Sequence, residues 1–262
     1  MSLVNIPTST GTTERYSFSK LSAWWTCPCG YYQRYIEHKT GIGNAFSSYG
    51  TLVHELMEKY AKGEIELWDL PQMYEWLFDS AVPESFPHNK FVNLRDAYYS
   101  QGLNFLKTFE GYENVKILGV EEEFIIPIDD WQFNGFIDIV FLDKEGKLII
   151  RDYKSKASFK NEAEKHKYTR QLYLYSLYVK EKYGRYPDEL QFLMFRKQRE
   201  PVCIQFDINK LEESLQWARD TVQIIRNAFD YPANCEAFYA ENLCNHRDYC
   251  PLKRHSKTTE KR

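Results

Sequence analysis

Two aspartates and a lysine interrupt an otherwise apolar stretch, residues 133–156. The stretch predicts two strands joined by a tight turn whose glycine is free to take a positive φ. Asp138 lies inside the first strand and Asp152 ends the second, so a hairpin places the two carboxylates side by side. Lys154 follows two residues later, on the same face as Asp152. Because two adjacent acids are costly unless a cation bridges them, the hairpin predicts a divalent-metal site.

Such a site is suited to hydrolysis of a phosphodiester bond. One or two hard divalent cations activate a water near neutral pH and offset the charge of a pentacovalent phosphorus. Asp138 and Asp152 are the candidate carboxylate ligands, and the backbone carbonyl of Tyr153 is a further one. Lys154 is a compact charge that can orient or help deprotonate the water and stabilise the phosphate. The alternative is a salt bridge on a surface hairpin, because an aspartate two residues before a lysine is common.

Composition narrows the class of protein. The 262 residues are 43% hydrophobic, which is enough for a substantial core, and we find no internal repeat. No apolar run approaches the roughly 18 residues of a membrane span, and the N-terminus lacks the basic-then-apolar pattern of a secretory signal. We therefore expect a cytoplasmic protein with no membrane contact. Its six cysteines are then expected to be free thiols or metal ligands rather than disulfides.

A basic stripe follows the two acids. The net charge of −3 does not by itself indicate a nucleic-acid partner. Lysines and arginines nevertheless outnumber acids between residues 151 and 170. A protein that binds a phosphate backbone needs such a stripe beside an acidic site. Lys156, Lys160 and Arg170 are therefore candidate DNA contacts.

Periodicity predicts the elements around the hairpin. We expect helices at 47–64, 161–183 and 209–229, and strands at 116–128, 189–197 and 202–207. This order predicts one α/β domain with a mixed sheet and helices on both sides. We expect disorder at 1–15, a single domain at 16–253 with a cysteine-bearing tail at 235–250, and a disordered basic end at 254–262.

The helix at 47–64 carries a further candidate. His54 and Glu58 are four residues apart, so they share one face of the helix. On its own, a histidine on a partly apolar helix is more often a packing or surface residue than a metal ligand.

Four segments, in order along the chain, resemble the PD-(D/E)XK nuclease superfamily. They are SKLSAWWTCPCGYYQRY at 19–35, YGTLVHELME at 49–58, GFIDIVFLDKEGKLIIRDYKS at 135–155 and QLYLY at 171–175. The resemblance is to the RecB-like exonuclease branch, which includes CRISPR-associated adaptation exonucleases and phage proteins. It implies a restriction-endonuclease-like core, with a mixed central sheet flanked by helices, an N-terminal helical region and the cysteine-bearing tail.

The resemblance also implies an activity and a site. The activity is that of a deoxyribonuclease dependent on Mg²⁺ or Mn²⁺, often an exonuclease on single strands or DNA ends, in recombination, repair or DNA processing. A homo-oligomer, or partners of the recombination or CRISPR type, would accompany it. The implied site consists of His54, Asp138 and Asp152 at the metal, Lys154 as the catalytic lysine, and Gln171 and Tyr175 near the site and the DNA.

Many relatives carry a [4Fe–4S] cluster, held by one cysteine before the core and three after it. Cys27 lies where the first would be, and Cys235, Cys244 and Cys250 supply the others, so a cluster would join the two chain ends. The step from Cys235 to Cys244 is longer than in relatives. Cys29 is therefore an alternative ligand for Cys27 or Cys235, and zinc or no metal at all stays open.

Two other classes of function stay open beside the nuclease. One is a DNA-binding or assembly module that keeps this fold without turnover, although the complete set of two acids and a lysine argues against it. The other is an iron–sulfur redox or sensor protein built on the cysteines. The remaining cysteine, Cys203, is expected to be a buried apolar residue within a strand.

Overall fold

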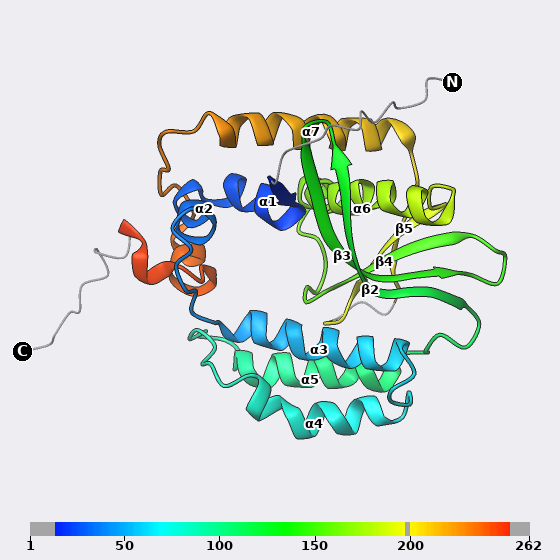
Figure 1. Ribbon diagram of the computed structural model, residues 1–262. Helices are drawn as coiled ribbons and strands as arrows, with labels where there is room; N and C mark the ends of the chain where they lie inside the picture. The colour runs from blue at the N-terminus through cyan, green and yellow to red at the C-terminus, as the bar shows by residue number, and fades with distance from the viewer. Residues whose placement is uncertain (1–13, 197–199, 252–262) are drawn as a thin grey trace, which may run out of the picture.

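The structure, a computed structural model, describes residues 14–196 and 200–251 (Figure 1). The expectations for residues 1–13 and 252–262 lie outside this range. The helices of the described chain are α1 (Phe18–Thr26), α2 (Pro28–Tyr35), α3 (Ala45–Ala61), α4 (Asp69–Ala81), α5 (Leu94–Thr108), α6 (Glu162–Tyr183) and α7 (Ile208–Arg226), with a π-helical turn η1 (Tyr239–Leu243) and a 3₁₀ turn η2 (Arg247–Tyr249). The strands are β1 (Arg15–Ser17), β2 (Lys116–Ile128), β3 (Trp131–Leu142), β4 (Leu148–Lys154), β5 (Glu189–Met194) and β6 (Val202–Gln205).

Strand β3 is the centre of a mixed six-stranded sheet. Strand β2 pairs antiparallel along its whole length and so occupies one edge of β3. The other edge is shared, because β1 pairs in parallel with residues 132–134 and β4 pairs antiparallel with residues 139–142. Strands β4 and β5 are parallel, and β5 and β6 are antiparallel. Residues 135–138 of β3 therefore lie in the interval between β1 and β4.

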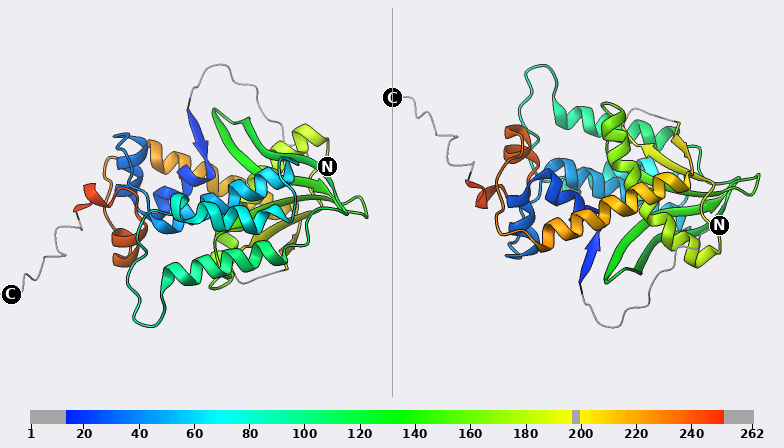
Figure 2. Two further views of the ribbon diagram at one scale, coloured as in Figure 1. Left: turned by 90° about the horizontal axis from the view of Figure 1, so that it is seen from below. Right: turned by 90° about the horizontal axis from the view of Figure 1, so that it is seen from above.

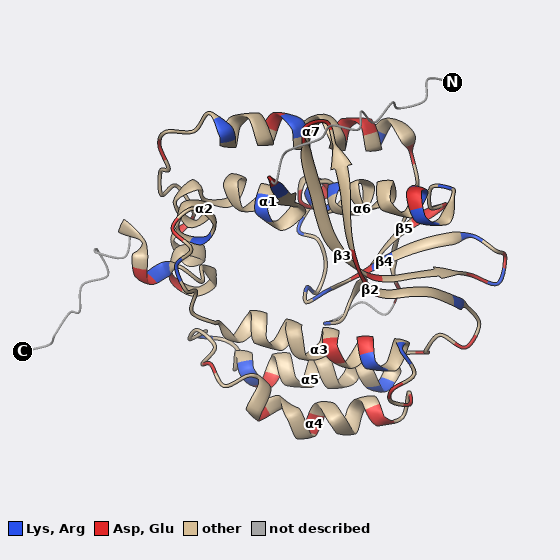
Figure 3. Cartoon of the chain, viewed as in Figure 1, with Lys and Arg blue, Asp and Glu red and all other residues tan. Residues whose placement is uncertain are grey.

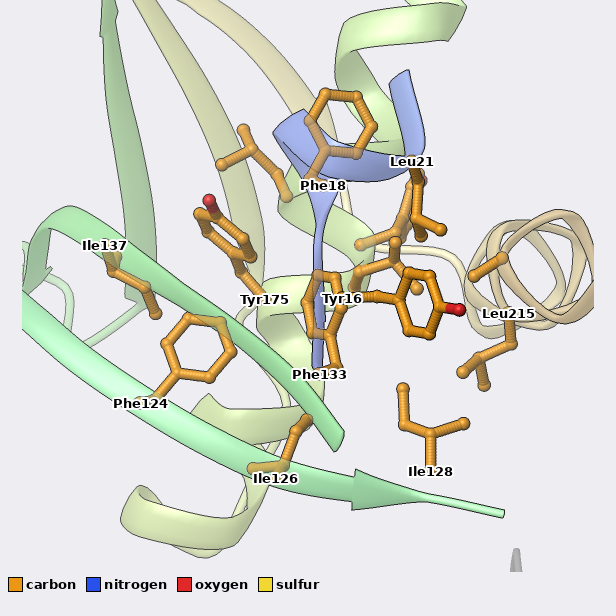
Figure 4. Packing of buried hydrophobic residues seen from close by; sticks show 14 of the residues in the cluster. Tyr16, Phe18, Leu21, Phe124, Ile126, Ile128, Phe133, Ile137, Tyr175 and Leu215 are labelled. Carbon is orange, nitrogen blue, oxygen red and sulfur yellow. The ribbon is translucent and has the colours of Figure 1, made fainter. Parts of the chain in front are cut away.

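Helices cover both faces of the sheet (Figures 1 and 2). Helices α1, α6 and α7 lie on one side, and α3, α4 and α5 lie on the other. Alternate side chains of β4 pack against the two helical layers. Leu148 and Ile150 belong to one buried apolar cluster (Figure 4), and Ile149 and Tyr153 belong to the other. A strand buried on both faces reads as a continuous apolar run, as the first three residues of β4 do. None of the described helices is both long and apolar enough to span a bilayer.

Capping residues set the ends of the two helices nearest to the hairpin. The Asn44 side chain accepts a hydrogen bond from the Ser47 N–H and begins α3. Asn161 does the same for α6, which ends at Gly184 with a φ of 76°. These are the preferred residue types at the two kinds of helix end. The boundaries predicted from periodicity differ from the observed ones by at most three residues.

Three local expectations were wrong. Arg15 was expected to be disordered, but it begins β1, a short polar strand held by its distant partner β3. The strand predicted at 189–197 ends at Met194, and a turn follows it. Cys203 was expected to be buried, but it is exposed, because β6 is the last strand of the sheet and one of its faces is open.

Candidate active site

The sheet is irregular on both sides of Asp138. In the register of β2 and β3 the residue opposite Asp138 is Glu121, which leaves the ladder with a φ of 48°. On the other edge, the ladder with β4 ends at Arg151, and the N–H of Tyr153 donates to Oδ2 of Asp138 at 2.7 Å. A non-glycine residue in the left-handed region costs about 1–3 kcal/mol, and such strain concentrates at functional sites.

Helix α3 brings a histidine to this irregular point. The Nδ1 atom of His54 lies 3.5 Å from Oδ2 of Asp138. One potential ligand atom from each of His54, Glu121 and Asp138 lies within 4.8 Å of the other two. Within residues 14–196 and 200–251 this is the one such group of three. Two carboxylates and an imidazole at this spacing suit a single divalent cation.

The electrostatics of the group favour a bound cation. Burial raises the pKa of Asp138 well above its ordinary value, and the charge of Asp152 raises it further. Burial and the charge of Asp138 raise the pKa of Glu121 to about 7. Burial lowers the pKa of His54, which keeps its imidazole neutral and available as a ligand. A cation would offset the desolvation and the repulsion that cause these shifts.

Lys154 is fixed beside this group by side chains from two elements. Its Nζ lies 2.8 Å from Oδ1 and 2.7 Å from Oδ2 of Asp152, and it donates to Oε1 of Gln171 at 3.0 Å. The Nε2 of Gln171 in turn donates to the hydroxyl of Tyr175 at 3.0 Å. The four-residue spacing on α6 puts Gln171 and Tyr175 on one face. The ammonium is thereby held in one place before any substrate arrives.

One carboxylate oxygen of the site lacks a hydrogen-bond donor. The Oδ2 of Asp152 is buried and accepts no hydrogen bond from the described residues, although the Lys154 ammonium is close. The ammonium at 2.7 Å pairs with the charge of this oxygen, so the carboxylate is compensated without a cation. The group that fits a divalent cation consists of His54, Glu121 and Asp138. Asp152 does not belong to this group of three among the described residues, so its role as a metal ligand stays a prediction.

An open pocket of about 420 Å³ gives access to the ligand group. Its wall is formed by the polar side of α3, with Ser47, Thr51, Glu55 and Glu58, facing Ser155 at the end of β4. Figure 3 shows acidic residues gathered on α3 and where β2 and β3 cross. A substrate with a negative charge would therefore need a cation here, since the wall itself repels anions.

Glu121 is the one residue of this group that the sequence did not predict. Its signal was a run of three acids, 121–123, in the strand expected at 116–128. Which of the three reaches Asp138 depends on the register of β2, and a shift between Ile117 and Gly119 sets that register. Tyr153 contributes its N–H to the site as described above, and the role predicted for its carbonyl oxygen stays a prediction.

The predicted DNA contacts lie beside the site, along the start of α6. Lys156 forms an ion pair with Glu164 at 2.8 Å, and the N–H of Lys160 donates to the same carboxylate. The guanidinium of Arg170 lies 5.0 Å from the centre of the Trp217 ring. Their contact with DNA stays a prediction.

Five cysteines gather where the start of α2 meets the tail that follows α7. Cys27 and Cys29 flank the first residue of α2, and Cys235, Cys244 and Cys250 come from the tail. Burial and, to a smaller extent, the neighbouring thiols raise the pKa of Cys29 to about 11. Burial and a hydrogen bond with Cys27 raise the pKa of Cys235 to about 12. All five are free thiols in the structure.

A family model described as the PD-(D/E)XK nuclease superfamily matches residues 15–254. The chain belongs to the PD-(D/E)XK nuclease superfamily. Membership makes this protein a nuclease, and so a hydrolase of phosphodiester bonds, in a superfamily whose members use divalent metals. The mixed sheet flanked by helices agrees with the restriction-endonuclease-like core that was predicted.

Two solved structures resemble this nuclease at low identity. One is a crystal structure of a "Putative exonuclease" from Eubacterium rectale, with 13% identity, coverage of 99% of this chain and 96% of that chain, and a TM-score of 0.49. The other is a crystal structure of SSO0001, with 16% identity, coverage of 94% and 90%, and a TM-score of 0.38. No curated protein matches this nuclease.

Proposed function

We propose that this nuclease is a deoxyribonuclease of the RecB-like exonuclease branch that requires Mg²⁺ or Mn²⁺. The observation that carries the proposal is the fixed Lys154 ammonium beside a group of ligands for a hard cation. In this proposal the protein degrades single strands or DNA ends in recombination, repair or DNA processing. Its setting is the cytoplasm of a bacterial or phage-infected cell, as a homo-oligomer or with partners of the recombination or CRISPR type.

Each residue of the site has a distinct task in this proposal. When bound to the carboxylates and the imidazole, the cation makes a water more acidic and offsets phosphate charge. Lys154 places a positive charge where it can orient that water and attract the scissile phosphate. Gln171 holds the ammonium, and Tyr175 holds Gln171, so no side chain has to reorganise during the reaction.

The path of the DNA follows from charge. The wall of the metal pocket is acidic, so the phosphate backbone is expected to enter along the lysines and arginines between residues 156 and 170. Lys156 and Lys160 lie just before the first residue of α6, and Arg170 lies within the helix. Each contact with a phosphate would add to the salt dependence of binding.

The decisive test is cleavage of end-labelled single- and double-stranded DNA with Mn²⁺. Asp152→Ala and Lys154→Ala should each lower the rate at least about 10²-fold, because Lys154 supplies the positive charge at the phosphate and Asp152 holds that ammonium in place. Both should keep the circular dichroism spectrum of the wild type. Lys144→Ala, in the exposed turn between β3 and β4, is the matched control and should cleave normally. Unchanged cleavage by both site variants would rule out this site. A wild type that cleaves neither DNA nor RNA with added metal would favour a silent DNA-binding module.

We also propose a [4Fe–4S] cluster on Cys27, Cys235, Cys244 and Cys250, with Cys29 as the alternative ligand. Among the described residues no three cysteine sulfurs lie within 4.8 Å of one another. A tetrahedral zinc ion with bonds of about 2.3 Å draws its thiolates closer than that. A four-iron cluster separates them, because each thiolate binds a different iron. Their convergence from the start of α2 and from the tail supports the cluster.

Anaerobic purification tests the cluster. We expect a brown protein with about four irons per chain, the content of a [4Fe–4S] cluster, and loss of the colour in Cys244→Ser. Cys203→Ser changes an exposed thiol outside the group and should keep the colour. A colourless wild type without iron would contradict both the cluster and a redox or sensor role.

A further inference from the structure

One side chain, that of Asn44, forms hydrogen bonds both to the start of helix α3 and to the cysteine-bearing tail. Asn44 is the N-cap of α3, and its Oδ1 accepts a hydrogen bond from the Ser47 N–H at 3.0 Å. Its Nδ2 points the other way and donates to the Leu243 carbonyl at 3.3 Å and to Oδ1 of Asn245 at 2.9 Å. One amide group therefore joins the first turn of α3 to the cysteine-bearing tail.

Main-chain contacts make the same connection. The N–H of Ile42 donates to the carbonyl of Asn245 at 2.7 Å. The guanidinium of Arg247 donates to the carbonyl of Gly43 at 3.4 Å. The two segments are so close that a Cβ on Gly41 would lie 3.2 Å from the Asn245 side chain. The residues next to Cys244 are thus docked on the segment that leads into α3, and Figures 1 and 2 show them side by side.

The position of α3 matters because it carries one member of the metal group. His54 comes from α3, whereas Asp138 and Glu121 come from the sheet, so no ladder hydrogen bond fixes their separation. Buried apolar residues such as Leu52 and Leu56 hold α3 against its layer, but apolar packing is not directional. A ligand constellation tolerates displacements of only about 0.5 Å. The directional hydrogen bonds at the N-cap, together with the one that the Tyr49 hydroxyl donates to the Phe195 carbonyl at 3.4 Å, therefore complete the placement of the helix.

We propose that Asn44 is a positioning residue. It links α3 to the cysteine-bearing tail, so the position of the tail affects the position of His54 in the metal group. It holds α3 in register with the tail, and α3 sets His54 against Asp138 and Glu121. This inference rests on the proposed function, since it concerns the same metal site. It goes further by giving the tail a direct effect on metal binding, separate from its effect on stability.

The test separates the two halves of the Asn44 amide. Asn44→Ser keeps a capping oxygen of equal strength and removes the donor to the tail. Asn93→Ser is the matched control, because Asn93 caps α5 and its amide donates to Asp96, not to the tail. Two quantities are measured without DNA. One is the set of imidazole NMR signals of His54 in metal-free protein, assigned with His54→Gln, and the other is the Mn²⁺ dissociation constant by calorimetry.

We expect Asn44→Ser to shift the His54 signals and to raise the Mn²⁺ dissociation constant by up to about tenfold, the lower end of the effect of losing a hydrogen bond to a ligand, because Asn44 acts on His54 through the helix. Asn93→Ser should change neither quantity. Asn245→Ala removes one acceptor from the tail side and should shift both in the same direction by less. It also serves if Asn44→Ser does not fold.

Wild-type His54 signals and wild-type Mn²⁺ affinity in both Asn44→Ser and Asn245→Ala would overturn the inference. Failure of the proposed function has a different signature. In that case the wild type itself binds no Mn²⁺, while the His54 signals still report whether Asn44 sets the position of the imidazole.

Discussion

At the scale of single residues, Glu121 carries two costs in the metal-free protein. Its backbone lies in the left-handed region, with a φ of 48°. Its carboxyl group is half-buried next to Asp138, and these surroundings raise its pKa to about 7. Both costs arise at the point where His54 approaches the sheet. A bound cation would offset the second of them, which explains why an acid stands where an uncharged residue would stabilise the fold.

Removing the charge of Glu121 should therefore stabilise the metal-free protein at high pH. A carboxyl group whose pKa is raised from 4.5 to about 7 on folding favours folding at low pH, and stability falls as the pH rises between these values. Glu121→Gln should thus increase the free energy of unfolding by roughly 1–2 kcal/mol at pH 8, after allowance for solvent screening, and by little at pH 4.5.

Urea unfolding without metal at the two pH values measures this difference. Glu123→Gln is the matched control, because Glu123 lies on the same strand but is exposed. An equal effect of Glu121→Gln on the free energy of unfolding at both pH values would show that the ionised Glu121 carboxylate does not destabilise the fold. The same variant should bind Mn²⁺ more weakly than the wild type, since it removes a carboxylate from the ligand group.

At the scale of elements, the hairpin of β3 and β4 could be predicted because its signals are local. The apolar runs, the turn glycine with its φ of 79° and the period of two place Asp138, Asp152 and Lys154 together. Helical spacing likewise predicts that Gln171 and Tyr175 share a face. The site thus follows from sequence wherever one element or one hairpin supplies the residues.

Other parts depend on partners that are far away in sequence, and these the sequence could not show. The approach of Glu121 to Asp138 depends on the register between the long strands β2 and β3. Strand β1 forms because its backbone pairs with the edge of β3. Strand β3 also twists at Asp138, so that Ile137 and Ile139 join different buried clusters. Strict alternation would have placed them on one face.

Gly135 of β3 provides a test of how closely α6 must approach the sheet. A Cβ at this position would lie 2.9 Å from side-chain atoms of both Phe124 and Tyr175, whose rings pack in the cluster of Figure 4. Gly135→Ala must therefore displace Tyr175, which holds Gln171. We expect a loss of about 1–3 kcal/mol of stability, typical of overpacking, together with slower cleavage.

Denaturant unfolding and the DNA cleavage assay measure the two effects of Gly135→Ala. Gly50→Ala is the contrasting change, because a Cβ there makes only ordinary contact with Ser155 at 3.5 Å. In the middle of α3, alanine is also the better helix former, so this variant should gain some stability. If Gly135→Ala is as stable and as active as the wild type, then the close approach of α6 is not needed.

At the scale of the whole molecule, the site lies between two layers. Helix α3 supplies His54 from one side of the sheet, and α6 supplies Gln171 from the other side. The carboxylates come from the strands between them. Any relative movement of the layers would therefore move His54 away from Asp138 or Gln171 away from Lys154, so the function requires that both layers are fixed to one sheet.

This arrangement predicts that residues 16–253 unfold as one unit. The two buried clusters share β3, β4 and β5, so neither layer can lose its packing without exposing strands that the other layer needs. Leu56→Ala in the cluster of α3 and Leu215→Ala in the cluster of α7 each remove a buried side chain, at a cost of about 2–5 kcal/mol. Calorimetry should show one transition in the wild type, and each variant should lower its midpoint. A second transition that moves in only one of the variants would mean that the layers are separate domains, and the sheet alone would then be too weak a connection to hold His54 in place.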